Sequence, residues 1–111
     1  MKTELNVALI QTDLLWEQPQ ANRKHIETYF EQLTSNTDVV FLPEMFSTGF
    51  TMRPELVAES MSGVTIQWMK QWSEKLQVAV AGSIAIEEEG QFYNRFVWVN
   101  AEGSIHHYDK R

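Results

Sequence analysis

The chain of 111 residues contains no cysteine. A disulfide framework is therefore excluded, and because disulfides belong to oxidising compartments, we expect a cytoplasmic protein. The sequence also lacks any thiol that could act as the nucleophile in covalent catalysis.

Long apolar runs are absent as well. No stretch approaches the roughly 20 apolar residues that a helix needs to cross a bilayer. The N-terminal segment MKTELNVALIQTD has a short apolar run broken by Gln11 and Asp13, and it lacks the cleavage site of a signal peptide. We therefore expect no membrane partner.

Basic residues are outnumbered by acidic ones. Nine Lys and Arg stand against 15 Asp and Glu, which gives a formal net charge of −6. Since phosphate binding needs clustered positive charge, a nucleic-acid partner is not expected. The 43% apolar and 22% charged residues are typical of a small globular domain with a core of its own.

The sequence predicts neither a metal site nor a cofactor site. His106 and His107 are adjacent, so on a strand they would face opposite sides and could not bind one metal together. His25 has no ligand-type residue four positions further along its predicted helix. The five Gly residues form no phosphate-binding loop, and no Ser stands in a GxSxG motif.

Hydrophobic patterning predicts alternating strands and helices. Short apolar or β-branched runs indicate strands, and apolar residues recurring every three to four positions indicate helices. The strands are predicted near 5–11, 39–42, 78–86, 94–100 and 105–109, and the helices near 19–34 and 64–76. Two strand–helix–strand units followed by a hairpin predict an α/β fold with both helices on one face of the sheet. The run LNVALIQ is nearly all apolar, so its strand is expected to be buried on both faces.

A carboxylate follows the second predicted strand. In VVFLPEMFSTGF, residues 39–50, Glu44 comes directly after the apolar run and is followed by Met45, Phe46 and Phe50. The carboxyl ends of strands in an α/β sheet are where ligands bind. Partial desolvation by these neighbours would disfavour the charged form of the carboxylate, as suits a general base. A capping or surface-paired Glu is an equally good interpretation of position alone.

A lysine ends the last predicted strand. Lys110 lies between Asp109 and Arg111, an arrangement more typical of a solvated charge cluster. The alternative is a buried ammonium that pairs with a carboxylate and stabilises an oxyanion during acyl transfer.

Several segments resemble a known family. NVALIQTDLLW, ANRKHIE, VVFLPEMFSTGF, VAVAGSIAI and YNRFVWVNAEGSIHHYDKR are similar, in order and approximate spacing, to the nitrilase superfamily of carbon–nitrogen hydrolases. The resemblance covers essentially the whole chain, and LPEMFSTGF and YDKR look most like the omega-amidase branch. It implies an α-β-β-α sandwich, a Glu-Lys-Cys catalytic set, and hydrolysis of the amide of small ω-amido dicarboxylates.

The resemblance also implies roles for single residues. Glu44 would be the general base, Lys110 would stabilise the tetrahedral intermediate, and Phe50 would line the small pocket near them. Asn94 would be structural, tying a loop or a strand end. Residues 1–111 would form the N-terminal part of a single carbon–nitrogen hydrolase domain, which commonly dimerises.

The sequence departs from the family at the nucleophile, because the catalytic Cys is absent. The family places that Cys well downstream of the Lys, so two hypotheses follow. Either the chain is part of an amidase whose second half supplies the Cys, or it is an inactive module that acts by association. In both cases one sheet face would lack a cover, and FVWV and VAVA are expected to lie on the exposed apolar surface.

Overall fold

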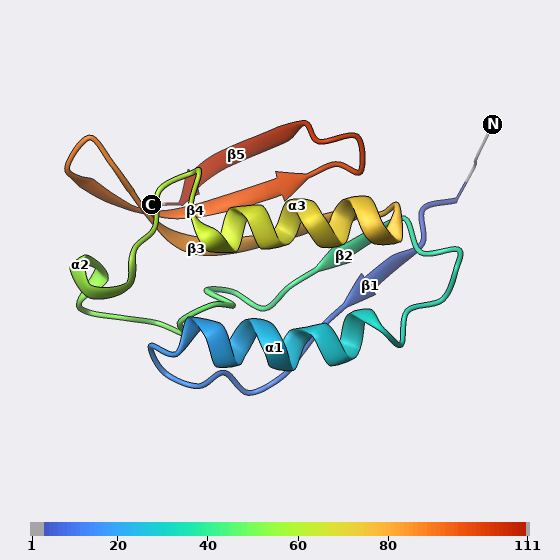
Figure 1. Ribbon diagram of the computed structural model, residues 1–111, viewed down its shortest axis with the longest axis horizontal. Helices are drawn as coiled ribbons and strands as arrows, with labels where there is room; N and C mark the ends of the chain where they lie inside the picture. Colours follow the sequence, from blue (N-terminus) through green and yellow to red (C-terminus); the bar gives the residue numbers. More distant parts are fainter. Residues whose placement is uncertain (1–3, 111) are drawn as a thin grey trace.

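The computed structural model of the chain describes residues 4–110, which form one sheet and three helices (Figure 1). In chain order these are β1 (Val7–Leu9), α1 (Pro19–Phe30), β2 (Val39–Phe41), α2 (Pro54–Val57), α3 (Val64–Leu76), β3 (Ala79–Glu88), β4 (Gln91–Val99) and β5 (Ile105–Lys110). No helix of the described residues is long and apolar enough to cross a membrane.

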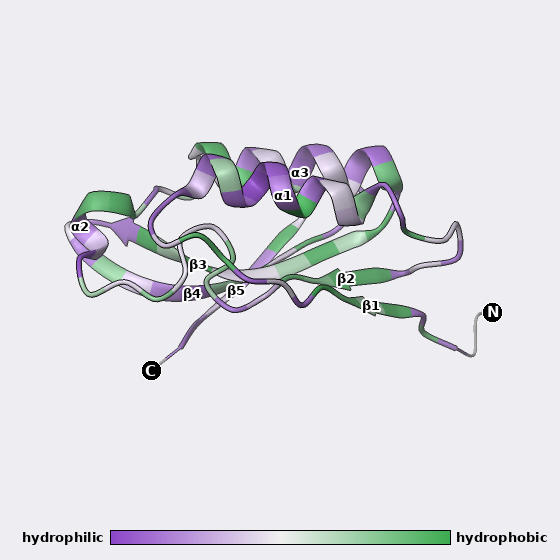
Figure 2. Cartoon of the chain, turned by 90° about the horizontal axis from the view of Figure 1, so that it is seen from below, coloured by the Kyte–Doolittle hydropathy of each residue, from purple (hydrophilic) through white to green (hydrophobic). Residues whose placement is uncertain are grey.

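The strands are ordered β1-β2-β3-β4-β5 in the sheet. The first three run parallel because α1 and α3 carry the chain back between them, and β3, β4 and β5 are antiparallel neighbours. Both long helices lie on the same face of the sheet (Figure 2). The predicted α/β fold, with both helices on one face, is therefore confirmed.

The core fills the space between the two helices and the sheet. Its fully buried side chains come from α1, α3 and the helix-facing positions of the strands, and they include Ile26, Phe30, Ile66, Met69, Val80, Ile84, Val97 and Val99. Phe30 stacks on Trp72 with ring centroids 5.0 Å apart. The indole N–H groups of Trp68 and Trp72 both donate to Glu27, so one carboxylate of α1 holds two tryptophans of α3.

Most element boundaries agree with the sequence predictions. The helix predicted at 64–76 is α3 itself, whereas α1 ends at Phe30 and continues as a turn in which Leu33 N–H donates to the Phe30 carbonyl. β3 and β4 are longer than predicted because Glu89 and Gly90 both adopt positive φ angles, 53° and 78°. That conformation closes a two-residue hairpin turn and lets the strands pair up to its edge. The short helix α2 was not predicted.

The sheet face opposite the helices is uncovered in the described residues, and we call it the open face. Cross-strand partners share a face, so the register places one row, Leu9, Phe41, Ala81, Trp98 and His106, on it. Leu9 is 68% exposed and Val7 is 47% exposed. The expectation that the first strand is buried on both faces is therefore wrong for the described residues, because their helices cover only one side of the sheet. Phe96 and Trp98 of FVWV lie on the open face as expected, whereas the expectation that VAVA lies on the exposed surface is wrong, because Val78, Val80 and Ala81 are buried.

Gly82 of β3 allows a close approach by the loop after β2. A Cβ built on Gly82 would lie 2.8 Å from Cδ1 of Phe46 and 3.0 Å from Cβ of Leu42. Phe46 is fully buried and stacks on Trp68 of α3, with centroids 5.8 Å apart. The missing side chain at position 82 thus lets the phenyl ring connect the sheet to the helix layer.

We expect Gly82→Ala to lower the free energy of unfolding by about 1–3 kcal/mol, because the added methyl overpacks the Phe46 ring. Urea denaturation measures this change. Phe46→Leu in the same chain frees space, so the double variant should lose less than the sum of the two single variants. Strict additivity would contradict the proposed clash.

Candidate functional site

Glu44 lies in a tight turn directly after β2. The parallel pairing continues beyond the strand, since Leu42 N–H donates to the Ala81 carbonyl at 2.7 Å. Pro43 follows, and residues 44–48 turn back, with Gly49 N–H donating to the Met45 carbonyl at 2.7 Å. The next two side chains, Met45 and Phe46, point into protein and are 5% and 0% exposed. Glu44 is left facing the open side of the sheet.

Lys110 meets Glu44 across this edge of the sheet. Its Nζ donates to Glu44 Oε1 at 2.5 Å, although the residues are 66 positions apart in the sequence. Lys110 is the last residue of β5 and pairs in register with Asn94 of β4. The predicted convergence of Glu44 and Lys110 is therefore confirmed, whereas their catalytic roles stay predictions.

The pair is more exposed than the sequence suggested. The side chain of Glu44 is 46% exposed and that of Lys110 is 39% exposed. The desolvation expected from Met45, Phe46 and Phe50 is not seen in the described residues. Met45 and Phe46 are buried, and Phe50 is exposed and borders a pocket whose lining does not include Glu44.

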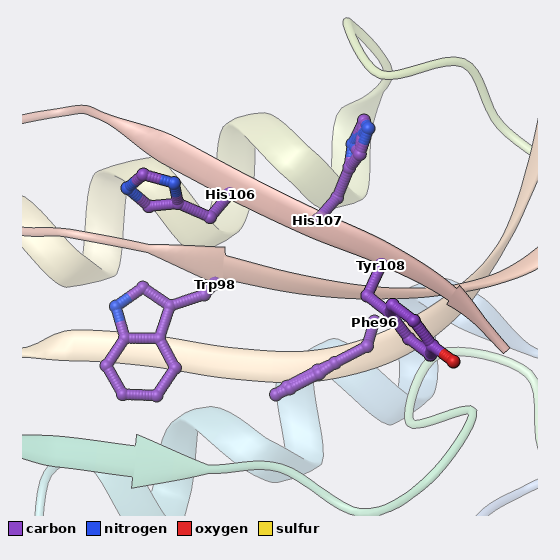
Figure 3. A pocket seen from close by; sticks show the side chains of 5 residues that line it. All are labelled: Phe96, Trp98, His106, His107 and Tyr108. Carbon is purple, nitrogen blue, oxygen red and sulfur yellow. The ribbon is translucent and has the colours of Figure 1, made fainter.

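An apolar cleft begins beside this ion pair. It has a volume of about 330 Å³ and is lined by Phe41, Leu42, Glu44, Gly82, Ser83, Phe96, Tyr108 and Lys110. A second hollow of about 440 Å³ continues along the open face over β4 and β5 (Figure 3). Figure 3 shows the five side chains that line it, which are Phe96, Trp98, His106, His107 and Tyr108. The arrangement offers one carboxylate and one ammonium at the rim of an otherwise apolar surface.

Phe50 does not line the cleft that holds Glu44 and Lys110. Its side chain is 71% exposed and borders a separate pocket of about 190 Å³, together with Met45 and Asn94. The substrate-binding role of Phe50 therefore stays a prediction. The buried Oδ1 of Asn94 has no hydrogen-bond partner among the described residues, so the expected structural tie is not seen there.

The described residues contain no group of three or more His, Asp or Glu side chains that could hold a metal ion. His106 pairs with Trp98 and His107 with Val97, so the two rings lie on opposite faces as predicted. His25 Nε2 lies 2.9 Å from the hydroxyl of Thr12.

Comparison with known proteins identifies the family of the chain. Residues 6–111 match the family model described as "Carbon-nitrogen hydrolase". The chain belongs to the carbon–nitrogen hydrolase family. The resemblance noted in the sequence is thereby confirmed.

Relatives of the chain carry amidase names. The omega-amidase YafV of Escherichia coli is 37% identical over 108 residues, which cover 96% of this chain and 41% of that protein. The 2-oxoglutaramate amidase of Bacillus subtilis is 29% identical over 101 residues, which cover 89% of this chain and 39% of that protein. The chain thus spans about two fifths of the length of these two relatives.

Solved structures of the family share the fold. XC1258 from Xanthomonas campestris, a CN-hydrolase superfamily protein, superposes with a TM-score of 0.91 at 34% identity, covering 96% of this chain and 40% of that one. Nit3 of Saccharomyces cerevisiae gives a TM-score of 0.84 at 21% identity, over 96% of this chain and 44% of that one. At that identity the second likeness shows the fold alone.

Sequence reasoning missed a charge cluster behind the site, in which a buried arginine binds two partly exposed carboxylates. Arg95 of β4 is 2% exposed and lies on the helix side of the sheet. Its guanidinium donates to both oxygens of Asp109, at 2.6 and 3.0 Å, and to both oxygens of Glu88, at 3.1 and 3.3 Å. The sequence pattern could have revealed this cluster. Arg95, Val97 and Val99 are two positions apart and share one face of the strand, so an arginine facing the core with the two valines needs carboxylate partners.

The cluster fixes the end of β5. Asp109 directly precedes Lys110, and successive strand residues face opposite sides, so Arg95 holds β5 from the helix side while Glu44 meets it from the open side. The hydrogen bond from Arg95 lowers the pKa of Asp109, and the same guanidinium lowers the pKa of Glu88. The two carboxylates in turn raise the pKa of Arg95.

We expect the cluster to make stability depend on pH in the acid range. Because the pKa values of Asp109 and Glu88 are lower in the folded chain, their contribution is present above their ordinary values of about 4 and is lost as the pH falls through the folded values. Unfolding free energies measured between about pH 3 and pH 7 should therefore fall at the acid end.

Arg95→Met should flatten this acid dependence, because it removes the group that favours the charged carboxylates. Lys24→Met removes the same charge from an exposed position of α1 and serves as the matched control. If the unfolding free energy falls equally at low pH in Arg95→Met and in the unaltered protein, Arg95 is not the cause of the acid dependence.

Proposed function

We propose that residues 1–111 form the N-terminal part of a single carbon–nitrogen hydrolase domain that hydrolyses the amide of a small ω-amido dicarboxylate. The observation that carries the proposal is the contact between Lys110 Nζ and Glu44 Oε1 at the rim of an apolar cleft. Family membership and the amidase names of two relatives support the reaction class.

In the proposed reaction, Glu44 accepts the proton of a cysteine thiol that another segment of the polypeptide supplies. The thiolate attacks the amide carbonyl, and Lys110 stabilises the oxyanion of the tetrahedral intermediate. Collapse of the intermediate, with proton transfer to the nitrogen, releases ammonia and leaves a thioester. Water, activated by Glu44, then hydrolyses the thioester to the free acid and restores the thiol.

The ion pair suits these two roles. The hydrogen bond from Lys110 Nζ orients the carboxylate of Glu44, and a carboxylate oxygen is the group that accepts a proton. The ammonium lies directly beside that carboxylate, so the carbonyl oxygen of a substrate bound next to the pair would be within reach of Lys110. The cleft, about 330 Å³ in volume, suits a small substrate.

The open face supports the domain assignment. Leu9 and Tyr108 are 68% and 67% exposed there, and Phe41 contacts Phe96 and Trp98 edge to face. An apolar sheet face of this kind needs a second layer, which we assign to a further part of the same polypeptide. Homodimerisation and cytoplasmic placement also stay predictions.

The alternative function, an inactive module that acts by association, rests on the same exposed face. The coding sequence separates the two proposals. A continuous reading frame with a Cys codon after a further strand supports the amidase. A stop codon directly after Arg111 supports the module.

In the longer polypeptide that the amidase proposal requires, Glu44→Gln should slow ω-amide hydrolysis by about 10²- to 10⁴-fold, because Gln cannot accept the thiol proton. Ammonia release from an ω-amide measures the rate. Gln is nearly isosteric with Glu, so the melting temperature should change little. A sharp fall in melting temperature, or a rate within a few-fold of the parent, would make Glu44 a structural carboxylate.

Lys110→Met in the same polypeptide should also slow turnover, because the oxyanion loses its cation and Glu44 loses its partner. Lys24→Met, on the exposed surface of α1, is the matched control and should leave turnover unchanged. Equal rates for the two variants would remove Lys110 from the proposed mechanism.

The 111-residue chain by itself should show no turnover of an ω-amide, because it contains no thiol. The assay is ammonia release by the purified chain, with the longer polypeptide as the positive control. Hydrolysis by the chain alone that Glu44→Gln abolishes would require water, in place of a thiol, as the nucleophile.

A further inference from the structure

Ser83 of β3 anchors the turn that carries Glu44. Its side chain is buried, and its Oγ accepts a hydrogen bond from the N–H of Met45 at 2.9 Å. Its own carbonyl accepts from the N–H of Phe46 at 3.3 Å. One residue of the sheet therefore receives the two backbone N–H groups that directly follow Glu44.

The anchored residue has an unfavourable backbone conformation. Met45 has a φ angle of 51°, in the left-handed region that residues with a Cβ seldom adopt. Such a conformation persists only where the surroundings enforce it. At Met45 the enforcement comes from the bond to Ser83 Oγ, from burial of the side chain, and from its carbonyl, which accepts from Thr48 and Gly49 N–H groups.

The conformation of Met45 sets the direction of Glu44. The two residues share a peptide unit, so a change of φ at Met45 rotates Glu44 relative to the buried part of the turn. Without an acceptor at position 83, the buried Met45 N–H would have no partner among the described residues, at a cost that favours rearrangement. Ser83 also lines the cleft beside Glu44 and Lys110, so any rearrangement occurs within the site.

We propose that Ser83 is a positioning residue for Glu44. Its hydroxyl oxygen holds Met45 in the left-handed conformation and thereby keeps the carboxylate of Glu44 against Lys110. The inference rests on the proposed function for its kinetic consequence. Its structural consequence, the contact between Glu44 and Lys110, can be measured whether or not the protein is an amidase.

The kinetic test uses the longer polypeptide with Ser83→Ala. Misplacement of the general base should lower kcat by about 10- to 100-fold with little change in KM, because Glu44 takes the proton and does not hold the substrate. Ser83→Thr keeps a hydroxyl oxygen and should retain most of kcat. Ser73→Ala is the matched control, since Ser73 is a buried serine of α3 whose hydroxyl donates to the Val78 carbonyl.

A double variant separates positioning from general loss of structure. If Ser83 acts through Glu44, adding Ser83→Ala to Glu44→Gln should cause no further loss of kcat. Additive losses would overturn the proposal, and so would a kcat for Ser83→Ala within a few-fold of that for Ser73→Ala. If Ser83→Ala does not fold, Ser83→Cys replaces it, because the thiol has a similar volume and is a weaker acceptor. An unchanged kcat in Ser83→Cys would overturn the proposal.

A crystal structure of Ser83→Ala gives the second readout. The proposal expects Lys110 Nζ and Glu44 Oε1 to be separated by more than about 4 Å, beyond ion-pair distance. A distance still close to 2.5 Å would overturn it. A parent protein without amide turnover would refute the proposed function, and this distance would then decide the role of Ser83 by itself.

Discussion

The turn after β2 rests on two neighbouring residues of β3, and the site depends on that contact. Gly82 has no side chain, so Phe46 can lie against the sheet and reach Trp68 of α3. Ser83 accepts the two backbone N–H groups of the turn. The same five-residue turn therefore joins the helix layer on one side and presents Glu44 on the other. A shift at this contact would disturb the core and the site together.

The end of β5 is held from both faces of the sheet. On the helix side, Arg95 binds Asp109 through two hydrogen bonds, and on the open side Glu44 accepts one from Lys110. β5 is an edge strand with one strand neighbour in the described residues, so backbone pairing alone fixes it only along β4. The two ion pairs act on consecutive residues of β5. They restrain its movement out of the plane of the sheet, which the backbone hydrogen bonds to β4 leave free. The buried Arg95 gives the firmer restraint, because surface pairs contribute little.

The sequence was sufficient for the layers of the fold but for only part of the site. The apolar stripe of Trp68, Met69, Trp72 and Leu76 repeats at helical spacing, so the position of α3 follows from local pattern. The pairing of Glu44 with Lys110 needed the family resemblance, because no local rule relates residues so far apart. Ser83 gave no signal, since a small polar residue within VAVAGSIAI is compatible with either face of a strand.

The errors have a common physical origin. The apolar run of β1 correctly indicated a strand suited to burial on two sides, but the described chain covers only one side of the sheet. Glu44 is exposed for the same reason. Periodicity reports what a side chain is suited to contact, whereas its exposure depends on which other segments are present.

The order of the strands in the sheet has a consequence for how the protein is made. Since β1 to β5 lie side by side in the order of synthesis, a nascent chain can add each strand to the one before it, and no strand has to insert between two that are already paired. The contact between Glu44 and Lys110 cannot form in this stepwise way, because the two residues are 66 positions apart in the sequence. It forms only after β5 has been synthesised. A ribosome-bound intermediate without β5 would therefore hold its helices and most of its core while its two site charges are still apart.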